Sequence, residues 1–116
     1  MTSSVKNKYH AQWIGVDLDG TLAYYDHYRG DNHVGAPTPL VSSVRQWVQD
    51  GLDVRIFTAR KPHPAIRRWC KEHLGKVLPI TSTKDSGMIA FLDDRAIGIR
   101  HNTGKPYSES NVKDLL

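Results

Sequence analysis

The residues best suited to chemistry in this chain are two aspartates, Asp17 and Asp19, which follow a short apolar run at positions 13–16. The run predicts a buried strand, and Gly20 supplies permissive backbone for a turn directly after it. A turn at the end of a strand allows both carboxylates to reach one point. Open α/β sheets bind their ligands outside the carboxyl ends of parallel strands. The pair therefore predicts a polar site at this edge of a sheet.

More acids follow a later apolar run in the sequence, where Asp93 and Asp94 come directly after it. The carboxyl ends of parallel strands meet at one edge of a sheet, so all four acids are expected there. At an effective dielectric of about 20, two carboxylates ~4 Å apart repel by about 4 kcal/mol. Such a cluster needs a cation, and ligands that are all oxygen, beside a phosphate, favour Mg²⁺.

Two further residues are suited to holding a phosphate. Thr58 directly follows a predicted strand at 54–57, and its hydroxyl and backbone amide could hold a phosphoryl oxygen. Lys84 precedes the last long apolar run, and its ammonium would neutralise charge on a carboxylate and on a transferring phosphoryl group; Lys76 is a weaker candidate for this role. Nucleophile, acid/base, metal and cationic clamp are the parts that phosphoryl transfer requires.

The remaining pattern predicts the elements that position these groups. Apolar residues recur at helical spacing over 39–50 and roughly 63–74, and a glycine follows each segment. Strands that alternate with helices predict one Rossmann-like α/β domain, mainly a parallel sheet flanked by helices. Pro79 favours an edge position for the third strand. The predicted strands are 12–17, 54–57, 77–80, 88–92 and 96–99.

Four segments lie outside this regular pattern. Residues 1–11 are predicted to be a flexible arm, and 22–38 a long loop or small flap, since loops of that length are usually functional or mobile. Residues 101–116 form a polar tail, with a final helical turn expected near 112–116. Only residues 82–87 separate the third and fourth strands, which is short for a parallel crossover. Either the third strand is very short or this connection is an extended loop.

In order and spacing, the polar motifs resemble those of the haloacid dehalogenase superfamily across residues 12–100, the expected catalytic domain. The matching motifs are Asp17-Leu18-Asp19-Gly20-Thr21 for motif I, Ile56-Phe57-Thr58 for motif II, Lys84 for motif III and Asp93-Asp94 for motif IV. Small, largely uncharacterised hydrolases of this superfamily, many from phage and bacterial genomes, are similar over Phe57-Thr58-Ala59-Arg60 and Asp93-Asp94-Arg95-Ala96-Ile97.

The resemblance implies a Mg²⁺-dependent phosphatase. Asp17 would attack phosphorus and form an aspartyl-phosphate, and Asp19 would protonate the leaving oxygen and then activate water. Thr58 would bind the phosphoryl group, and Lys84 would stabilise the intermediate. True dehalogenases of this superfamily lack an acid at the position of Asp19, which favours a phosphatase. The implied metal ligands are Asp17, the backbone carbonyl of Asp19, Asp93 and, directly or through water, Asp94. The expected substrate-binding residues are Thr58, Ala59, Arg60 and Lys84, and for Arg60 a solvated loop position is an equal alternative to phosphate contact.

Larger members of this superfamily insert a cap domain after motif I or between motifs II and III, and this sequence has no room for a substantial cap. An open site is therefore expected, which suits a phosphate on a nucleic-acid end or a protein, as well as a nucleotide. A net charge of +4 favours anionic partners, so a nucleotide or polynucleotide phosphate is the favoured substrate. The alternative is a non-catalytic domain of this fold that binds phosphorylated or nucleic-acid partners. A phosphomutase is less favoured, because no cap would hold a sugar phosphate in two orientations.

The composition sets the remaining expectations. A chain of 116 residues suits one domain, and no apolar run is long enough to cross a membrane. A polar first dozen residues and a lone cysteine favour a cytoplasmic protein. Oligomeric state has no signal in the sequence. Structural interpretations are favoured for the other notable residues: Arg95 paired with an acid, Trp47, Trp69 and Cys70 in the core, His27 and His33 without a ligand role, and Arg67, Arg68 and Lys71 on a solvated helix face.

Overall fold

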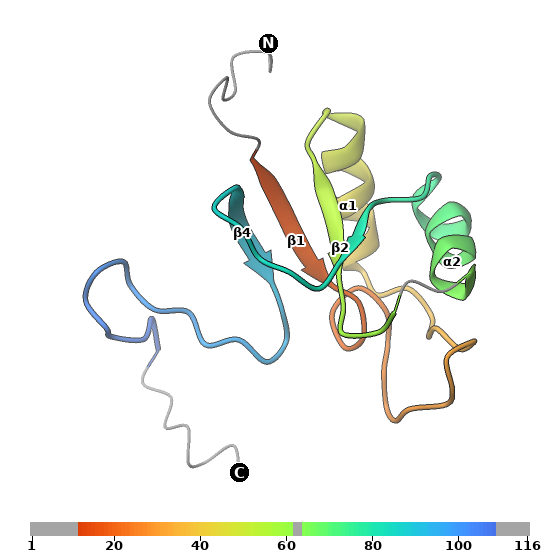
Figure 1. Cartoon of the computed structure of the whole chain (residues 1–116), viewed down its shortest axis with the longest axis horizontal. Helices are drawn as coiled ribbons and strands as arrows, with labels where there is room; N and C mark the ends of the chain where they lie inside the picture. The colour runs from red at the N-terminus through yellow and green to blue at the C-terminus, as the bar shows by residue number, and fades with distance from the viewer. Residues whose placement is uncertain (1–11, 62–63, 109–116) are drawn as a thin grey trace.

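The protein, seen in a computed structural model that describes residues 12–61 and 64–108, contains a four-stranded parallel sheet and two helices (Figure 1). In chain order the elements are β1 (Trp13–Asp17), α1 (Leu40–Gln49), β2 (Val54–Phe57), α2 (Pro64–Leu74), β3 (Ile80–Thr81) and β4 (Met88–Leu92). This confirms the predicted Rossmann-like α/β class, and the described residues include no cap domain. The expectations for residues 1–11, 63 and 112–116 fall outside the described ranges.

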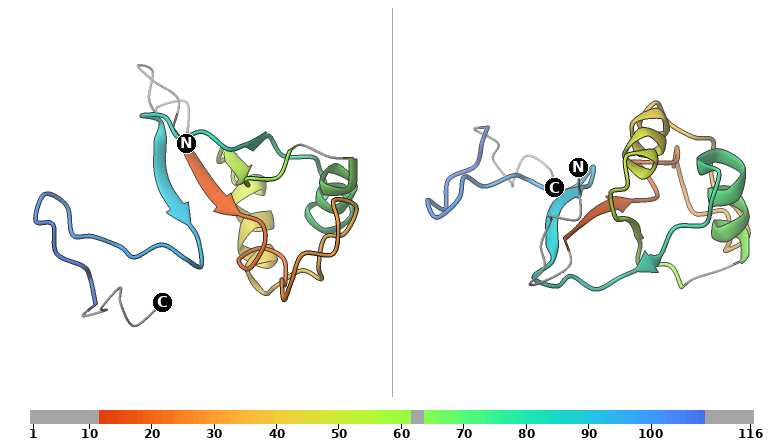
Figure 2. Two further views of the ribbon diagram at one scale, coloured as in Figure 1. Left: turned by 60° about the horizontal axis from the view of Figure 1, so that its bottom comes forward. Right: turned by 90° about the horizontal axis from the view of Figure 1, so that it is seen from above.

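The strand order β3-β2-β1-β4 puts β1 in the middle of the sheet and confirms the edge position of β3. The connections through α1 and α2 step in one direction along the sheet. Since such crossovers are right-handed, both helices cover the same face. The contact between the two helices and the views in Figure 2 agree with this arrangement. Val16 and Ile56 from the strands meet Val44, Ile66 and Cys70 from the helices there, all fully buried. Within the described residues, no helix is both long and apolar enough to span a bilayer.

The connection from β3 to β4 needs only six residues because it contains no helix. β3 has only two residues, and the chain returns to the start of β4 through a loop and a turn without a helix. Asp85 fixes this loop to the start of β1, because its Oδ1 accepts hydrogen bonds from Trp13 Nε1 and from the Gly87 amide, both at 2.8 Å. The second face of the sheet therefore has no helix over it among the described residues. Lys84 lies there instead, with Nζ 5.7 Å from the ring centre of Phe91.

Two strand predictions need correction. The third strand begins at Ile80 rather than at residue 77, although the Pro79 carbonyl still accepts a hydrogen bond of 2.8 Å from the amide of Ile56. The fifth strand, expected over 96–99, does not join the sheet: Ile99 forms an isolated antiparallel bridge with Pro106. This segment pairs locally with the chain that follows it, which satisfies its backbone without the sheet.

Residues 22–38 form a loop whose two ends are tied together, here called loop 22–38. Ala23 bridges Pro37, and the Tyr24 amide donates to the Ala36 carbonyl at 2.8 Å. Trp69 Nε1 in α2 donates to the carbonyl of Gly35 at 2.7 Å, which ties the loop to the body of the domain. The loop therefore lies beside the carboxyl ends of the strands as an ordered wall rather than as a cap (Figure 1).

Candidate functional site

A cavity of about 340 Å³ lies at the carboxyl ends of β1 and β2. Asp17 ends β1, Thr58 follows β2, and Asp93 follows β4, so three neighbouring strands each deliver a polar side chain to it, as the parallel sheet predicts. The cavity is lined by Asp17, Asp19, Tyr25, Phe57, Thr58, Ala59, Arg60, Asp93 and Arg95. Eight of these nine residues belong to the motifs quoted from the sequence, and Tyr25 lies outside them.

Three of the four predicted acids form a cluster. Carboxylate oxygens of Asp17, Asp93 and Asp94 all lie within 4.8 Å of one another. The hydroxyl of Thr21 lies 3.2 Å from Asp17 Oδ2 and 3.3 Å from Asp94 Oδ1, and it accepts the Asp94 backbone N–H at 3.0 Å. Gly20 makes this approach feasible, because its φ is +89° and a Cβ there would lie 2.5 Å from an Asp94 carboxylate oxygen. The close approach of Asp94 to this turn therefore depends on the glycine at position 20.

The acid cluster changes the protonation of its central member. The pKa of Asp17 is raised from 3.8 to about 7. Burial is the largest cause, followed by the negative charge of Asp93 and a hydrogen bond with the carboxyl of Asp94, while the Thr21 hydroxyl acts in the opposite direction. In the absence of a cation, the surroundings of Asp17 therefore oppose its negative charge.

The donor set of this acid cluster fits a hard divalent cation. All its side-chain donors are carboxylate oxygens, which suit Mg²⁺ or Ca²⁺ better than softer transition metals. A cation at this point would also remove the repulsion that raises the pKa of Asp17. Asp17, Asp93 and Asp94 are thus the residues that could hold it.

Asp19 has a different partner from the other acids. Its two carboxylate oxygens accept hydrogen bonds from Arg60 Nε and Nη2, both at 2.9 Å, which is a bidentate ion pair. Arg60 Nη1 also donates to the backbone carbonyl of His33 in loop 22–38 at 2.7 Å. The sequence favoured Arg95 as the arginine paired with an acid, whereas the structure assigns that pair to Arg60. Arg95 lines the cavity, and its backbone N–H donates to Asp93 Oδ1 at 2.7 Å.

Thr58 is buried at the floor of the cavity, but only part of its expected role is available. Its backbone N–H donates to the carbonyl of Thr81 at 3.0 Å, so this amide is engaged in pairing β2 with β3 and is not directed at a phosphate. The hydroxyl accepts the backbone N–H of Arg60 at 3.1 Å and retains its own proton for donation. The expectation for the hydroxyl stays a prediction, while the expectation for the amide is wrong in this structure.

Two predicted site residues do not line the cavity: Asp94, which still belongs to the acid cluster, and Lys84. Lys84 lies in the loop before β4, exposed, with its ammonium beside the ring of Phe91. Phe91 in turn contacts Phe57, with 4.8 Å between ring centres, and Phe57 lines the cavity. The ammonium is therefore next to the site across two aromatic rings, not among its lining side chains.

Two residues of the site were missed from the sequence. Thr21 was quoted within the first motif without a role, although a hydroxyl four residues after Asp17, in the turn that follows, is a common local hydrogen-bonding group. Tyr25 carries no signal in the sequence beyond its place in loop 22–38, and only the fold brings it to the cavity.

Comparisons with known proteins bear on the fold. No family model and no curated protein matches this sequence. Among solved structures, a conserved protein from Bacteroides thetaiotaomicron is similar, with a TM-score of 0.57 and 23% identity over 78% of this chain and 83% of that protein. At this level of identity the likeness establishes a shared small α/β fold and nothing about activity.

Proposed function

We propose that this protein is a Mg²⁺-dependent phosphatase of the haloacid dehalogenase type, which hydrolyses a phosphate monoester through an aspartyl-phosphate. The observation that carries the proposal is the acid cluster: oxygens of Asp17, Asp93 and Asp94 within 4.8 Å of one another, at a cavity that also receives the side chain of Thr58. An acid at the end of the central strand, beside a site for a hard cation, is the arrangement that an aspartate nucleophile for phosphorus needs.

In the first step, a carboxylate oxygen of Asp17 attacks phosphorus, and the bond from phosphorus to the alcohol oxygen breaks. The alcohol leaves with a proton supplied by Asp19. In the second step, water attacks the phosphorus of the aspartyl-phosphate, Asp19 takes the proton of that water, and Asp17 and inorganic phosphate are released. The Thr58 hydroxyl, which lines the cavity, donates a hydrogen bond to a phosphoryl oxygen in this scheme.

Mg²⁺ bound by Asp17, Asp93 and Asp94 would offset the negative charge of the acids and of the phosphoryl group.

Arg60, which pairs with Asp19, would also control when Asp19 can act in this scheme. Both oxygens of Asp19 are bound by Arg60, so one of those hydrogen bonds must be exchanged before Asp19 reaches the leaving oxygen. An incoming phosphate offers Arg60 an equivalent bidentate partner, so substrate binding itself would release Asp19.

A non-catalytic, phosphate-binding domain is the second candidate. Two observations favour it: the Asp19 carboxylate is engaged by Arg60, and the Lys84 ammonium lies outside the cavity. In that case, the acid cluster and Arg60 would bind a phosphorylated partner without turnover.

The test is phosphate release from 4-nitrophenyl phosphate and a panel of nucleotides, each with Mg²⁺ and with EDTA. Asp17→Asn should lower Mg²⁺-dependent release by roughly 10³-fold or more, because it removes the nucleophile. Asp50→Asn is the matched control, since Asp50 is exposed at the end of α1, and it should release phosphate like the wild type. Release that persists in Asp17→Asn would contradict the mechanism. Mg²⁺-dependent binding of phosphate without release from any substrate would favour the non-catalytic domain.

A further inference from the structure

A second cavity, of about 370 Å³, opens within loop 22–38. Tyr24, Tyr25, Asp26 and Arg29 line it, together with residues on the returning side of the loop, among them His33. Tyr25 also lines the cavity that contains the acid cluster, so the two cavities adjoin at this side chain. The structure therefore has a second space directly next to the proposed phosphoryl site.

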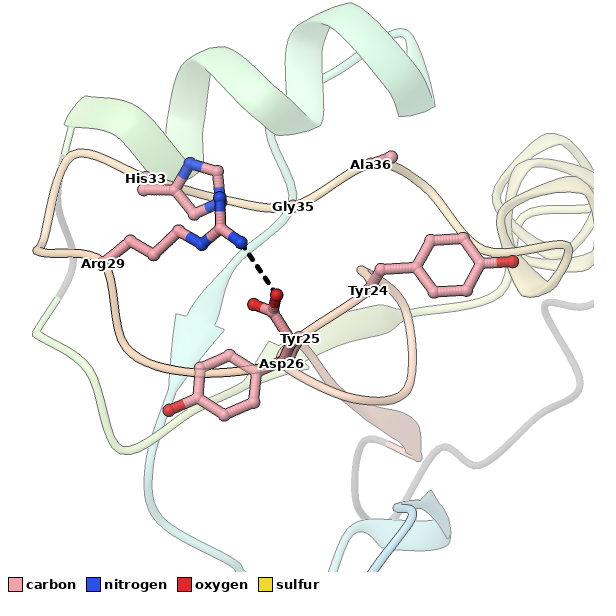
Figure 3. A pocket seen from close by; sticks show the side chains of 7 residues that line it. All are labelled: Tyr24, Tyr25, Asp26, Arg29, His33, Gly35 and Ala36. Atoms are coloured by element: carbon pink, nitrogen blue, oxygen red, sulfur yellow. Dashed lines mark hydrogen bonds and ion pairs between the residues drawn. The ribbon is translucent and has the colours of Figure 1, made fainter.

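The lining of the second cavity combines flat rings with a charged pair. Tyr24 and Tyr25 are 59% and 41% exposed, although both are large aromatic residues. In Figure 3 their rings project to opposite sides of the Asp26 carboxylate, and Arg29 reaches across the loop to that carboxylate, with Nη2 2.7 Å from Oδ2. Exposed rings offer stacking surfaces, and the pair offers both donors and acceptors for hydrogen bonds.

Arg60 connects the walls of the two cavities. Its guanidinium binds Asp19 in the first cavity and the carbonyl of His33, a residue of the second. Trp69 holds the facing side of the loop in place through the carbonyl of Gly35. The second cavity is thus fixed to the catalytic one by hydrogen bonds, so a ligand that spans both would meet two spaces held in a set relation.

We propose that the second cavity receives the nucleobase of a nucleotide whose phosphate lies at Asp17, which assigns the substrate class of the proposed phosphatase and rests on that function. Tyr25 stacks on the base, and the Asp26–Arg29 pair binds hydrogen-bonding groups on its edge. A phosphotyrosine ring would use the stacking surface but has no edge donors or acceptors to match the charged pair. A glycerol phosphate would use neither.

The experiment compares kcat/KM for nucleoside monophosphates, O-phosphotyrosine and glycerol 2-phosphate in the wild-type chain and in tyrosine variants. Wild type should prefer nucleotides over glycerol 2-phosphate, and Tyr25→Leu should lower this preference by roughly 10-fold, the usual effect of removing one stacked ring. Tyr25→Phe keeps the ring and should retain the preference. Tyr107→Leu changes an exposed tyrosine outside both cavities and should retain it too. A terminally phosphorylated oligothymidylate distinguishes free nucleotides from polynucleotide ends, which share this chemistry.

Failure of this inference can be separated from failure of the proposed function. If release depends on Asp17 but Tyr25→Leu leaves the nucleotide preference unchanged, the nucleobase cavity is wrong and the phosphatase stands. Equal preference for phosphotyrosine and nucleotides also overturns base recognition. If no substrate is hydrolysed, calorimetric binding of nucleoside monophosphates decides: binding weakened by Tyr25→Leu and kept by Tyr25→Phe supports the cavity, and no binding by wild type overturns it.

Discussion

At the scale of single residues, the environment of Asp17 has a measurable consequence for stability. A pKa of about 7 in the folded protein, against 3.8 ordinarily, means that the folded state binds a proton more tightly than the unfolded state. Between these two values the folded state holds more protons, so the free energy of unfolding falls as the pH rises. The metal-free protein should therefore be less stable at pH 8 than near pH 4, as far as Asp17 alone is concerned.

Asp17→Asn should remove the free-energy cost of keeping Asp17 ionised in the folded protein. The full shift in pKa corresponds to about 4 kcal/mol, but Asp17 is only partly buried, so we expect Asn to stabilise the EDTA-treated protein by about 1–2 kcal/mol at pH 8. The gain should shrink as the pH falls from 7 and disappear below pH 3.8, where Asp17 is mostly protonated in both states. Urea denaturation across this pH range measures it, with Asp50→Asn as the control. A variant that is less stable than the wild type at pH 8 would show that the acid cluster does not oppose the charge of Asp17.

Thr21 should act on the proposed cation site through its neighbours. Its hydroxyl bridges the carboxylates of Asp17 and Asp94, so Thr21→Val should leave them less well oriented and raise the Kd for Mg²⁺ by about 10-fold, typical of the loss of a group that orients metal ligands. Thr21→Ser keeps the hydroxyl and should bind Mg²⁺ like the wild type. Calorimetric titration of Mg²⁺ measures both. Equal Kd values for the valine and serine variants would mean that the bridge is dispensable.

The residue types at the strand ends were predictable, but several of their partners were not. Asp17, Thr58 and Asp93 follow apolar runs, and parallel strands bring such residues to one edge whatever the rest of the chain does. Arg60 and Tyr25 depend on how loop 22–38 folds back, and no periodic pattern encodes that path. Side-chain contacts between distant loops therefore could not be predicted from the sequence.

At the scale of elements, the strand predictions succeeded for the three strands of four or more residues. β2 and β4 span the predicted 54–57 and 88–92, and β1 begins one residue after its predicted start. The run at 96–99 resembles a strand in composition, but β4 occupies the edge beside β1, and Tyr107 pairs with Gly98 through its amide instead. A short apolar run does not reveal whether its hydrogen bonds are local or belong to the sheet.

Loop 22–38 depends on one glycine. A Cβ on Gly35 would lie only 1.9 Å from the backbone carbonyl oxygen of Tyr24, across the paired ends of the loop. Gly35→Ala must push the two sides apart, so we expect a loss of about 2 kcal/mol or more in unfolding free energy, together with lower activity. Urea denaturation and phosphate release measure these effects.

Gly51→Ala is the comparison for this variant. Gly51 has a positive φ, +86°, which Gly35 does not, but a Cβ there meets open space away from the site, so the cost should stay near 1–2 kcal/mol with unchanged kcat/KM. If Gly35→Ala kept full activity and stability, loop 22–38 could not be a fixed wall of both cavities.

At the scale of the whole molecule, the acid cluster joins the centre of the sheet to one of its edges. Asp17 belongs to β1, while Asp93 and Asp94 follow β4, which pairs only with β1 in the described sheet. The face of the sheet opposite the helices has no helix over it among the described residues, so β4 has few other contacts to hold it. Its attachment to the domain should therefore depend on whether the acid cluster is neutralised.

Mg²⁺ should consequently stabilise the whole fold and β4 most of all. At about 100 times its Kd, a ligand that binds only the folded state adds about 2.7 kcal/mol, which for a domain of this size raises Tm by about 10 °C or more. Amide exchange should slow most in β4 (Met88–Leu92), because local opening of that strand separates Asp93 and Asp94 from Asp17. Asp93→Asn should lose most of both effects, whereas Asp50→Asn should keep them, with NaCl of equal ionic strength correcting for screening. Protection spread evenly over the sheet, or equal stabilisation of Asp93→Asn, would mean that the cation binds elsewhere and that β4 is held by its strand pairing alone.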